Sequence, residues 1–328
     1  MTRNRIIIAG IICSFLTGVL ATAQAAPLTD QSMGSLIFDV KDHGAKGDGK
    51  TLDTLAIQSA IDAAHKAGGG TVLFGHNSTY LTGTIYLKSN VRIHVADHSK
   101  ILGSRNLADY GTDTGVSPYY PEPLGLCLIY AKNCSNITFS GKGTIHGGLS
   151  PEGMAAPNEY TGIARRQRPM CIRFENCENI EARDQLWTGA WGWFSHFKNC
   201  KGIYLTGLRV LNKRQDGFNI ESSQNIRVSD CHLECGDDAF AFTTSHASKP
   251  IKNVVIVNCY IKTRWAGVRF GPLGKGDFEN VLISNCTFEN CNGGGIKFDP
   301  LEGGEVRNCI FSDIVMDGVT APIVMVTA

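Results

Sequence analysis

A short apolar pattern recurs along the second half of the chain, at a spacing that restricts the fold more than any other feature. An Asn or Gly followed by Ile or Val opens five runs separated by 23, 23, 28 and 27 residues, at Asn179-Ile180, Gly202-Ile203, Asn225-Ile226, Asn253-Val254 and Asn280-Val281. Unequal periods of this size are typical of stacked coils that carry loop insertions. Each unit holds short β-branched runs between Gly, Asn and Ser turns, and no helical pattern supplies crossovers. Because one such unit cannot bury a core alone, the repeats predict an all-β chain folded as a single-stranded right-handed parallel β-helix.

The N-terminal part of the chain differs from the repeats. Residues 53–67 carry apolar side chains at helical spacing, and the pattern stops at Gly68-Gly69-Gly70. The open end of a β-helix invites aggregation unless another element covers it. We therefore expect an N-terminal helix that caps the first coil.

The first residues resemble an export signal. Arg3 and Arg5 precede an apolar run over residues 6–20, and Ala23-Gln24-Ala25 follows as a small-residue cleavage site. This order is typical of a secretory signal peptide, and the run is shorter than a membrane span. We expect residues 1–25 to be removed and residues 26–328 to form one β-helix catalytic domain, secreted or periplasmic. The apolar end at residues 324–328 predicts further coils beyond residue 328.

Charge excludes two classes of partner. The 31 Lys and Arg residues nearly balance the 30 Asp and Glu residues, so no electrostatic attraction to nucleic acid or to an anionic membrane is expected. We expect a monomer without a cofactor.

The cysteines follow the repeat. Asn133-Cys134, Asn176-Cys177 and Asn199-Cys200 lie at one offset from a strand, and Asp230-Cys231, Asn258-Cys259 and Asn285-Cys286 lie at another; Asn308-Cys309 is a looser copy. A free Cys behaves as a small buried hydrophobic residue, and an Asn in such a column can hydrogen-bond its amide to the next coil. The pattern favours stacked thiols, with one or two disulfides left open.

Four segments align on successive coils, and the candidate site residues lie in them or next to them. They span residues 216–220, 238–242, 266–270 and 294–298, and their alternation sends two columns of apolar side chains inward. Asn219, Ala241, Arg269 and Lys297 then face solvent, together with Asp237 and Trp265. Three carboxylates, Asp216, Asp237 and Asp238, are thereby expected at one end of this face, beside Trp265, Arg269 and Lys297.

Clustered carboxylates are suited to glycoside hydrolysis. A like-charged neighbour raises a carboxyl pKa, so one Asp can keep a proton as general acid while another stays ionised. A separation of roughly 6.5–9.5 Å would admit a water and invert the anomer, whereas about 5–5.5 Å would retain it. An ordinary Asp-rich turn is the alternative, but the register of Asp216 one coil earlier favours a site.

Several motifs resemble a known family. Phe38-Asp39-Val40, Gly44-Ala45-Lys46-Gly47-Asp48-Gly49, Gly69-Gly70-Thr71-Val72 and Tyr80-Leu81-Thr82-Gly83 resemble the start of pectin-degrading β-helix proteins. The pattern Trp193-x-x-His196-x-x-x-Cys200, with Asp216-Gly217 and Gly236-Asp237-Asp238-Ala239, is similar to glycoside hydrolase family 28, the polygalacturonases. That resemblance implies Asp237 as general acid, Asp216 and Asp238 as residues that activate the water, an inverting reaction and no metal. It also implies a galacturonate-containing pectic polysaccharide or oligosaccharide as substrate.

The chain departs from the family at three motifs. Arg214-Gln215-Asp216 stands for Asn-Thr-Asp, Arg264-Trp265-Ala266 for Gly-His-Gly, and Gly295-Ile296-Lys297 for Arg-Ile-Lys. The carboxylates are kept while the substrate contacts change, so we expect Lys297, Arg269 and Trp265 to bind the substrate. Homogalacturonan and rhamnogalacturonan, and endo and exo cleavage, stay open. A β-helix polysaccharide lyase that uses Ca²⁺, and a non-catalytic polysaccharide-binding β-helix, are the alternatives.

Overall fold

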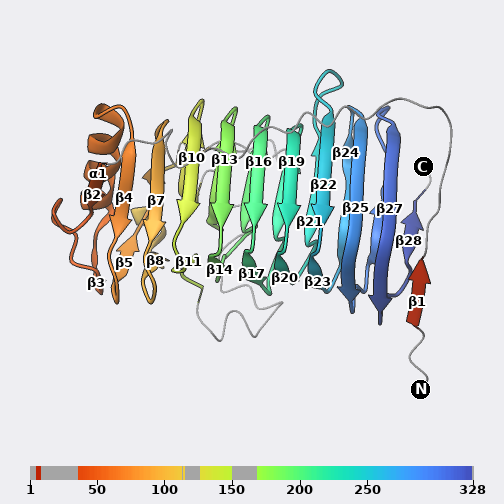
Figure 1. The fold of residues 1–328 in the computed structure, drawn as a ribbon, viewed down its shortest axis with the longest axis horizontal. Coiled ribbons are helices and arrows are strands. Elements are labelled where there is room, and N and C mark those ends of the chain that lie inside the picture. The colour runs from red at the N-terminus through yellow and green to blue at the C-terminus, as the bar shows by residue number, and fades with distance from the viewer. Residues whose placement is uncertain (1–4, 9–35, 113, 115–125, 150–167, 327–328) are drawn as a thin grey trace.

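The protein is described by a computed structural model that covers residues 5–8, 36–112, 114, 126–149 and 168–326. Short strands lie side by side along the long axis of the molecule, in three parallel stacks that form the walls of one helix (Figure 1). The right-handed parallel β-helix predicted from the repeats is confirmed.

The first stack contains the runs from which the repeat was recognised. It consists of β2 (Ile37–Asp39), β4 (Gly70–Phe74), β7 (Val91–Val95), β10 (Ser135–Ser140), β13 (Glu178–Arg183), β16 (Lys201–Thr206), β19 (Gln224–Ser229), β22 (Ile251–Val257), β25 (Phe278–Glu289) and β27 (Val306–Asp317). Ile180, Ile203, Ile226, Val254 and Val281 pair in register from β13 to β25, and all five are buried. The repeat therefore marks one column of the core.

The second stack follows the first along each coil. It consists of β3 (Asp48–Leu52), β5 (Thr79–Thr82), β8 (Lys100–Gly103), β11 (Thr144–His146), β14 (Leu186–Thr188), β17 (Arg209–Asn212), β20 (His232–Cys235) and β23 (Tyr260–Thr263), and it ends on the second halves of β25 and β27. A short 3-10 helix, η2 (Leu107–Asp109), follows β8.

The third stack closes the coil. It consists of β6 (Ile85–Tyr86), β9 (Cys127–Lys132), β12 (Met170–Glu175), β15 (Ser195–Lys198), β18 (Phe218–Glu221), β21 (Phe240–Thr244), β24 (Ala266–Gly274), β26 (Gly294–Phe298) and β28 (Ile323–Met325). The rings of Phe242, Phe270 and Phe298 stack along the axis, with centroids 5.4 and 4.9 Å apart. The two inward columns expected from the aligned segments are present in this register.

The predicted N-terminal helix is α1 (Thr54–Lys66). Its buried residues Ile57, Ala60, Ile61 and Ala64 recur at helical spacing and form one apolar face. The helix lies at the end of the β-helix and contacts β2, β4, β6 and β7 (Figure 1). It thus covers the first coil, as the sequence predicts.

Asparagine ladders run along two corners, as the Cys pattern predicts. The side-chain amides of Asn176 and Asn199 each donate to the Asn one coil earlier, at 3.1 and 3.2 Å. A second ladder joins Asp230, Asn258 and Asn285. The ladder residues have φ near +50 to +57°, the left-handed region that Asn and Asp tolerate better than other non-glycine residues.

The looser copy, Asn308-Cys309, lies in a different column from Cys231, Cys259 and Cys286. Asn308 donates to Asn280, and Cys309 pairs in register with Val281 rather than with Cys286. Asn280 and Asn285 belong to different ladders: Asn280 donates to Asn253, and Asn285 donates to Asn258. Asn308 extends the ladder of Asn280. The eleven described cysteines are free thiols, all buried or partly buried.

Most of the predicted signal segment lies outside the described residues. Its residues 5–8 form β1 (Arg5–Ile8), which pairs antiparallel with β27 at the far end of the β-helix. Among the described residues, no helix is long and apolar enough to cross a membrane. Removal of residues 1–25 stays a prediction.

Candidate active site

Three aspartates meet where the second stack turns into the third. Asp216 follows β17, and Asp237 and Asp238 follow β20 on the next coil. Phe218 pairs with Phe240, so Asp216 and Asp238 occupy the same place on adjacent coils. Gly236 permits this turn, because a Cβ there would lie 2.2 Å from the carbonyl oxygen of Lys213. The sequence-predicted carboxylates are therefore brought together.

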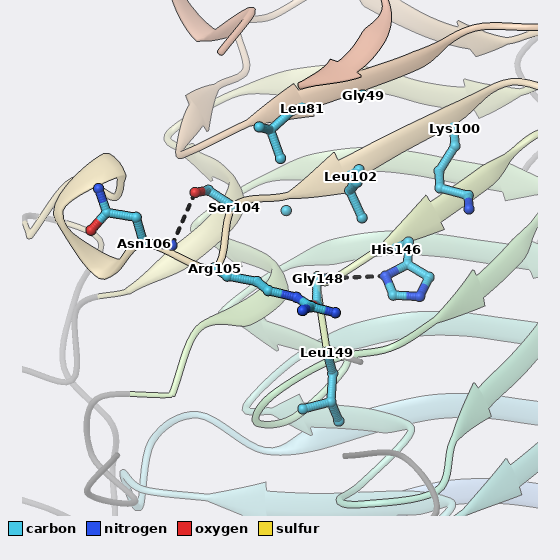
Figure 2. A pocket seen from close by; sticks show the side chains of 11 residues that line it. Gly49, Leu81, Lys100, Leu102, Ser104, Arg105, Asn106, His146, Gly148 and Leu149 are labelled. Carbon is cyan, nitrogen blue, oxygen red and sulfur yellow. Dashed lines mark hydrogen bonds between the residues drawn. The ribbon is translucent and has the colours of Figure 1, made fainter. Parts of the chain in front are cut away.

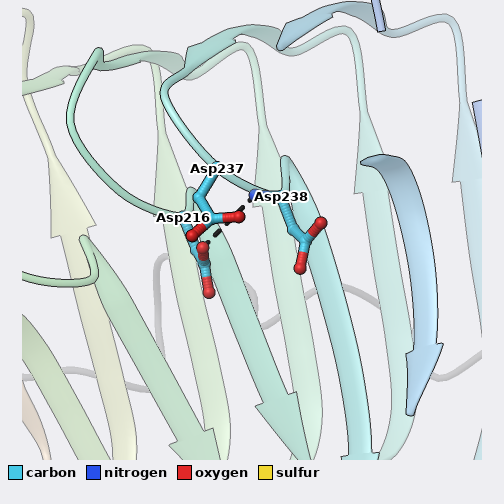
Figure 3. Close-up of side chains that lie close together, drawn as sticks. All are labelled: Asp216, Asp237 and Asp238. Carbon is cyan, nitrogen blue, oxygen red and sulfur yellow. Dashed lines mark hydrogen bonds between the residues drawn. The ribbon is translucent and has the colours of Figure 1, made fainter. Parts of the chain in front are cut away.

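The three carboxyl groups are in close proximity (Figure 3). One oxygen from each lies within 4.8 Å of the others, and Oδ1 of Asp216 accepts a hydrogen bond from the backbone N–H of Asp238 at 3.2 Å. Asp216 and Asp238 are 5% and 2% exposed, whereas Asp237 is only partly buried. Asp237 is thus the carboxyl group most accessible from solvent.

Burial and mutual repulsion shift the protonation of this cluster. Burial raises the pKa of Asp216 well above its usual value, and the charges of Asp238 and Asp237 add to the effect. Burial also raises the pKa of Asp238, although the neighbouring Arg269 guanidinium opposes the rise. The cluster consequently keeps at least one proton at pH values where an isolated Asp would be ionised.

The same three oxygens could hold a cation by their spacing. However, Nη1 of Arg269 already contacts Oδ2 of Asp238 at 3.2 Å, and the backbone N–H of Ala266 donates to Oδ1 of Asp238 at 3.1 Å. Both oxygens of Asp238 therefore already have a donor, and the Arg269 guanidinium supplies a positive charge next to Oδ2.

Asp299, which the sequence analysis did not single out, joins the two predicted cations. Nε of Arg269 donates to one oxygen of Asp299, and Nζ of Lys297 lies 3.3 Å from the other. Arg269 and Lys297 pair in register as expected, but a carboxylate neutralises the repulsion between them without substrate. A period-2 reading of β26 could have indicated this residue, because position 299 lies two residues after Lys297 on the same face.

Arg269 and Lys297 remain within reach of a ligand. Their side chains are 23% and 12% exposed, and Nη2 of Arg269 has no partner among the described residues. The structure thus leaves one guanidinium nitrogen for a substrate contact, while Nη1 of Arg269 pairs with Asp238.

Trp265 forms the open wall beside these cations. It is 43% exposed, and Nζ of Lys297 lies 4.9 Å from the centre of its ring. Gly293 makes room for the indole, because a Cβ there would lie 2.8 Å from Cδ2 of Trp265. An exposed indole beside cations is a surface on which a sugar ring can stack.

The rest of the expected outward column is not solvent-exposed. Asn219 and Ala241 are each 4% exposed, contrary to the expectation that both face solvent. Alternation along a strand determines only whether a side chain faces the core or the outside of the coil. On β18 and β21, which lie between β15 and β24, the outward-facing side chains are nevertheless buried. The accessible part of the site is therefore concentrated on Asp237, Trp265, Arg269 and Lys297.

Comparison with known proteins gives a consistent result. The model of "Glycosyl hydrolases family 28" matches residues 96–328, and that of "Rhamnogalacturonase A/epimerase, pectate lyase-like" matches residues 37–94. A probable polygalacturonase of Vitis vinifera is 26% identical over 61% of this chain and 43% of its own length. An exo-poly-alpha-D-galacturonosidase of Dickeya chrysanthemi is 24% identical over 76% of this chain and 50% of its own length.

Solved structures agree on the fold. The exopolygalacturonase of Thermotoga maritima superposes with a TM-score of 0.75 at 19% identity, covering 89% of this chain and 76% of the other. The chain spans about half the length of the curated relatives it matches.

Proposed function

The chain belongs to family 28 of the glycosyl hydrolases, and we propose from this premise that it hydrolyses glycosidic bonds in galacturonate-containing pectic polysaccharides or oligosaccharides. One observation carries the proposal: three carboxyl groups, two of them buried, each have an oxygen within 4.8 Å of the others, beside two partly buried cations and an exposed indole. Such a cluster can hold a proton for a leaving group and a negative charge for a water molecule.

In the proposed reaction Asp237 is the general acid. Its partial exposure lets its proton reach the glycosidic oxygen as the bond to the anomeric carbon breaks. A water molecule attacks that carbon, and Asp216 or Asp238 accepts the proton which the water loses. The raised pKa values of the buried pair make them stronger bases than ordinary aspartates once ionised.

The inverting outcome rests on the family resemblance. The separation of 4.8 Å or less between the closest oxygens is below the roughly 6.5–9.5 Å usual for an inverting pair. Three carboxylates can instead place the water between Asp216 and Asp238 while Asp237 faces the leaving group. Proton NMR of the first-formed anomer decides the point, since a retained anomer would remove the water-activating role from this pair.

Lys297, Arg269 and Trp265 are the proposed substrate contacts. Lys297 and the remaining nitrogen of Arg269 would bind a sugar carboxylate, and the open face of Trp265 would support a pyranose ring. Because Nε and Nη1 of Arg269 are engaged, we propose one hydrogen bond from this residue rather than a bidentate pair.

Product analysis on a panel of pectic fragments tests the activity. We expect new reducing ends from galacturonate-containing fragments, without the ultraviolet absorbance of an unsaturated sugar and without inhibition by a chelator. Unsaturated products lost on chelation would instead indicate a Ca²⁺-dependent lyase. Glycan binding without any bond cleavage would indicate the non-catalytic β-helix.

We further propose that the protein acts outside the cytoplasm as a monomer. The N-terminal signal pattern supports export, and a pectic polymer is an extracellular substrate. N-terminal sequencing of the exported protein should find Ala26 first, and an intact Met1 would contradict cleavage.

A further inference from the structure

A second concave site lies on the outer face of the second stack (Figure 2), and none of the three aspartates lines it. Its cavity of about 540 Å³ is lined by residues of β3, β5, β8 and β11 and of the turns that follow β8 and β11. This volume falls within the range of small-ligand pockets. Lys100, Arg105 and His146 supply its polar side chains, and Leu81, Leu102 and Leu149 supply its apolar wall.

The two cations of this pocket lack a counter-charge. Neither Lys100 nor Arg105 forms an ion pair with any residue in the described part of the chain. The carboxylate in the same turn, Asp109, accepts hydrogen bonds from Ser104 and Asn106 instead. Two positive groups therefore face one cavity without neutralisation.

Gly148 forms hydrogen bonds with both His146 and Arg105 and so orients their side chains. Its backbone N–H donates to Nδ1 of His146 at 3.0 Å, and its carbonyl accepts from Nε of Arg105 at 3.1 Å. Burial and the charges of Lys100 and Arg105 lower the pKa of His146 to about 4, so the ring is neutral. With Nδ1 accepting, its proton lies on Nε2, which makes His146 a hydrogen-bond donor.

From these contacts we propose that the pocket binds the carboxylate of an acidic saccharide, as a second polymer-binding site. The free guanidinium nitrogens of Arg105, Nζ of Lys100 and Nε2–H of His146 are all donors, which suits an anion. The leucines beside them suit the C–H face of a pyranose. That the sugar is a galacturonate rests on the proposed function; the anion recognition does not.

The position of the pocket suits a polymer rather than a single sugar. Arg105 follows β8, and Asp216 follows β17, three strands further along the second stack. At about 4.8 Å per strand, the two sites are roughly 14 Å apart along the axis. The pocket would retain an acidic chain whose other part lies at the carboxylates.

Binding without turnover tests the proposal. In an Asp237→Asn background, titration with an oligogalacturonate should show at least about a tenfold loss of affinity in the Lys100→Ala/Arg105→Ala double variant. Lys142→Ala removes an exposed lysine on the turn before β11 and should leave the affinity unchanged. An unchanged affinity in the double variant would overturn the site.

A second readout reports on the pocket itself. The His146 ring signals, assigned with His146→Gln, should shift saturably in proton NMR with digalacturonate and stay in place with neutral galactobiose. Shifts with inorganic phosphate but not with digalacturonate would overturn saccharide recognition and leave a simple anion site. Because neither measurement needs catalysis, an inactive enzyme would count against the proposed function alone.

Discussion

Oδ1 of Asp216 accepts a hydrogen bond from the backbone N–H of Asp238, 3.2 Å away on the next coil. The bond holds one buried carboxyl group against the main chain that carries another. In return, the carbonyl of Asp238 accepts from the N–H of Gly217 at 2.9 Å. The fold thus maintains a repulsive pair that two mobile loops would separate.

Burial of Asp216, together with this repulsion, predicts a pH-dependent gain in stability for Asp216→Asn. The pKa of Asp216 is higher in the folded protein than its unfolded value of about 3.9, so the folded state binds more protons above that pH. Wild-type stability consequently falls as pH rises from about 4 towards the folded pKa, whereas the asparagine cannot ionise. We expect the variant's Tm advantage to grow over this interval in calorimetry.

Asp42→Asn provides the matched control. Asp42 is exposed in the first described turn, so the same substitution there measures what an Asp-to-Asn exchange outside the cluster does to Tm. A Tm difference for Asp216→Asn that is equal at all pH values would contradict the raised pKa.

Asp237→Asn should lower turnover severely and leave the fold intact, because an amide cannot deliver a proton to the leaving oxygen. The expected loss in kcat is about 10²–10⁴-fold. Asp238→Asn should also be severe, since it removes a proposed acceptor of the water's proton. Reducing-end assays give the rate, and circular dichroism checks the fold. Near-wild-type activity in Asp237→Asn would remove this residue from the mechanism.

Arg269→Lys should separate substrate binding from support of the aspartates. Losing a charged hydrogen bond predicts a fall in kcat/KM of roughly one to two orders of magnitude on uronate-containing substrates. At pH values above the acidic limb of the profile, neutral-sugar substrates should be nearly unaffected if the contact is with a sugar carboxylate. Equal losses on both would leave Arg269 as a partner of Asp238 and Asp299.

The pH profile gives Arg269→Lys a second readout. The guanidinium lowers the pKa of Asp238, so weakening the contact raises this pKa and delays ionisation. The acidic limb of kcat/KM should then move to higher pH. An unmoved limb would show that Asp238 does not titrate in the measured step.

The stacked thiols predict the outcome of alkylation. Burial raises the pKa of Cys127 and of Cys291 to about 12, so native protein should label slowly. After denaturation without reductant, mass spectrometry should find most of the eleven cysteines of the β-helix labelled. Four or five bridges would show a disulfide framework instead.

Gly293→Ala should damage the site without touching a carboxylate. The added methyl would lie 2.8 Å from the indole and 2.9 Å from the backbone carbon of Trp265, so the ring must move. We expect a higher KM with little change in kcat, matching Trp265→Phe. Wild-type KM in both variants would exclude the indole from sugar binding.

The core and the carboxylates could be predicted because both follow the register of the strands. Once Phe218 is aligned with Phe240, the positions of Asp216 and Asp238 on adjacent coils follow from the spacing alone. The ion pairs could not be predicted in this way. Arg269 has carboxylates on two sides, and only the packed side chains show that Asp238 and Asp299 both bind it.

The first-stack strands stay in register although the repeats differ by up to five residues in length. Length differences are absorbed by turns, while Ile180 and its successors keep their place. Natural variation can therefore lengthen or replace a corner without changing the rungs on either side. The rungs that hold Arg269 and Lys297 are in this way insulated from insertions at other corners, so the loops around the site can be exchanged while its two cations stay in place.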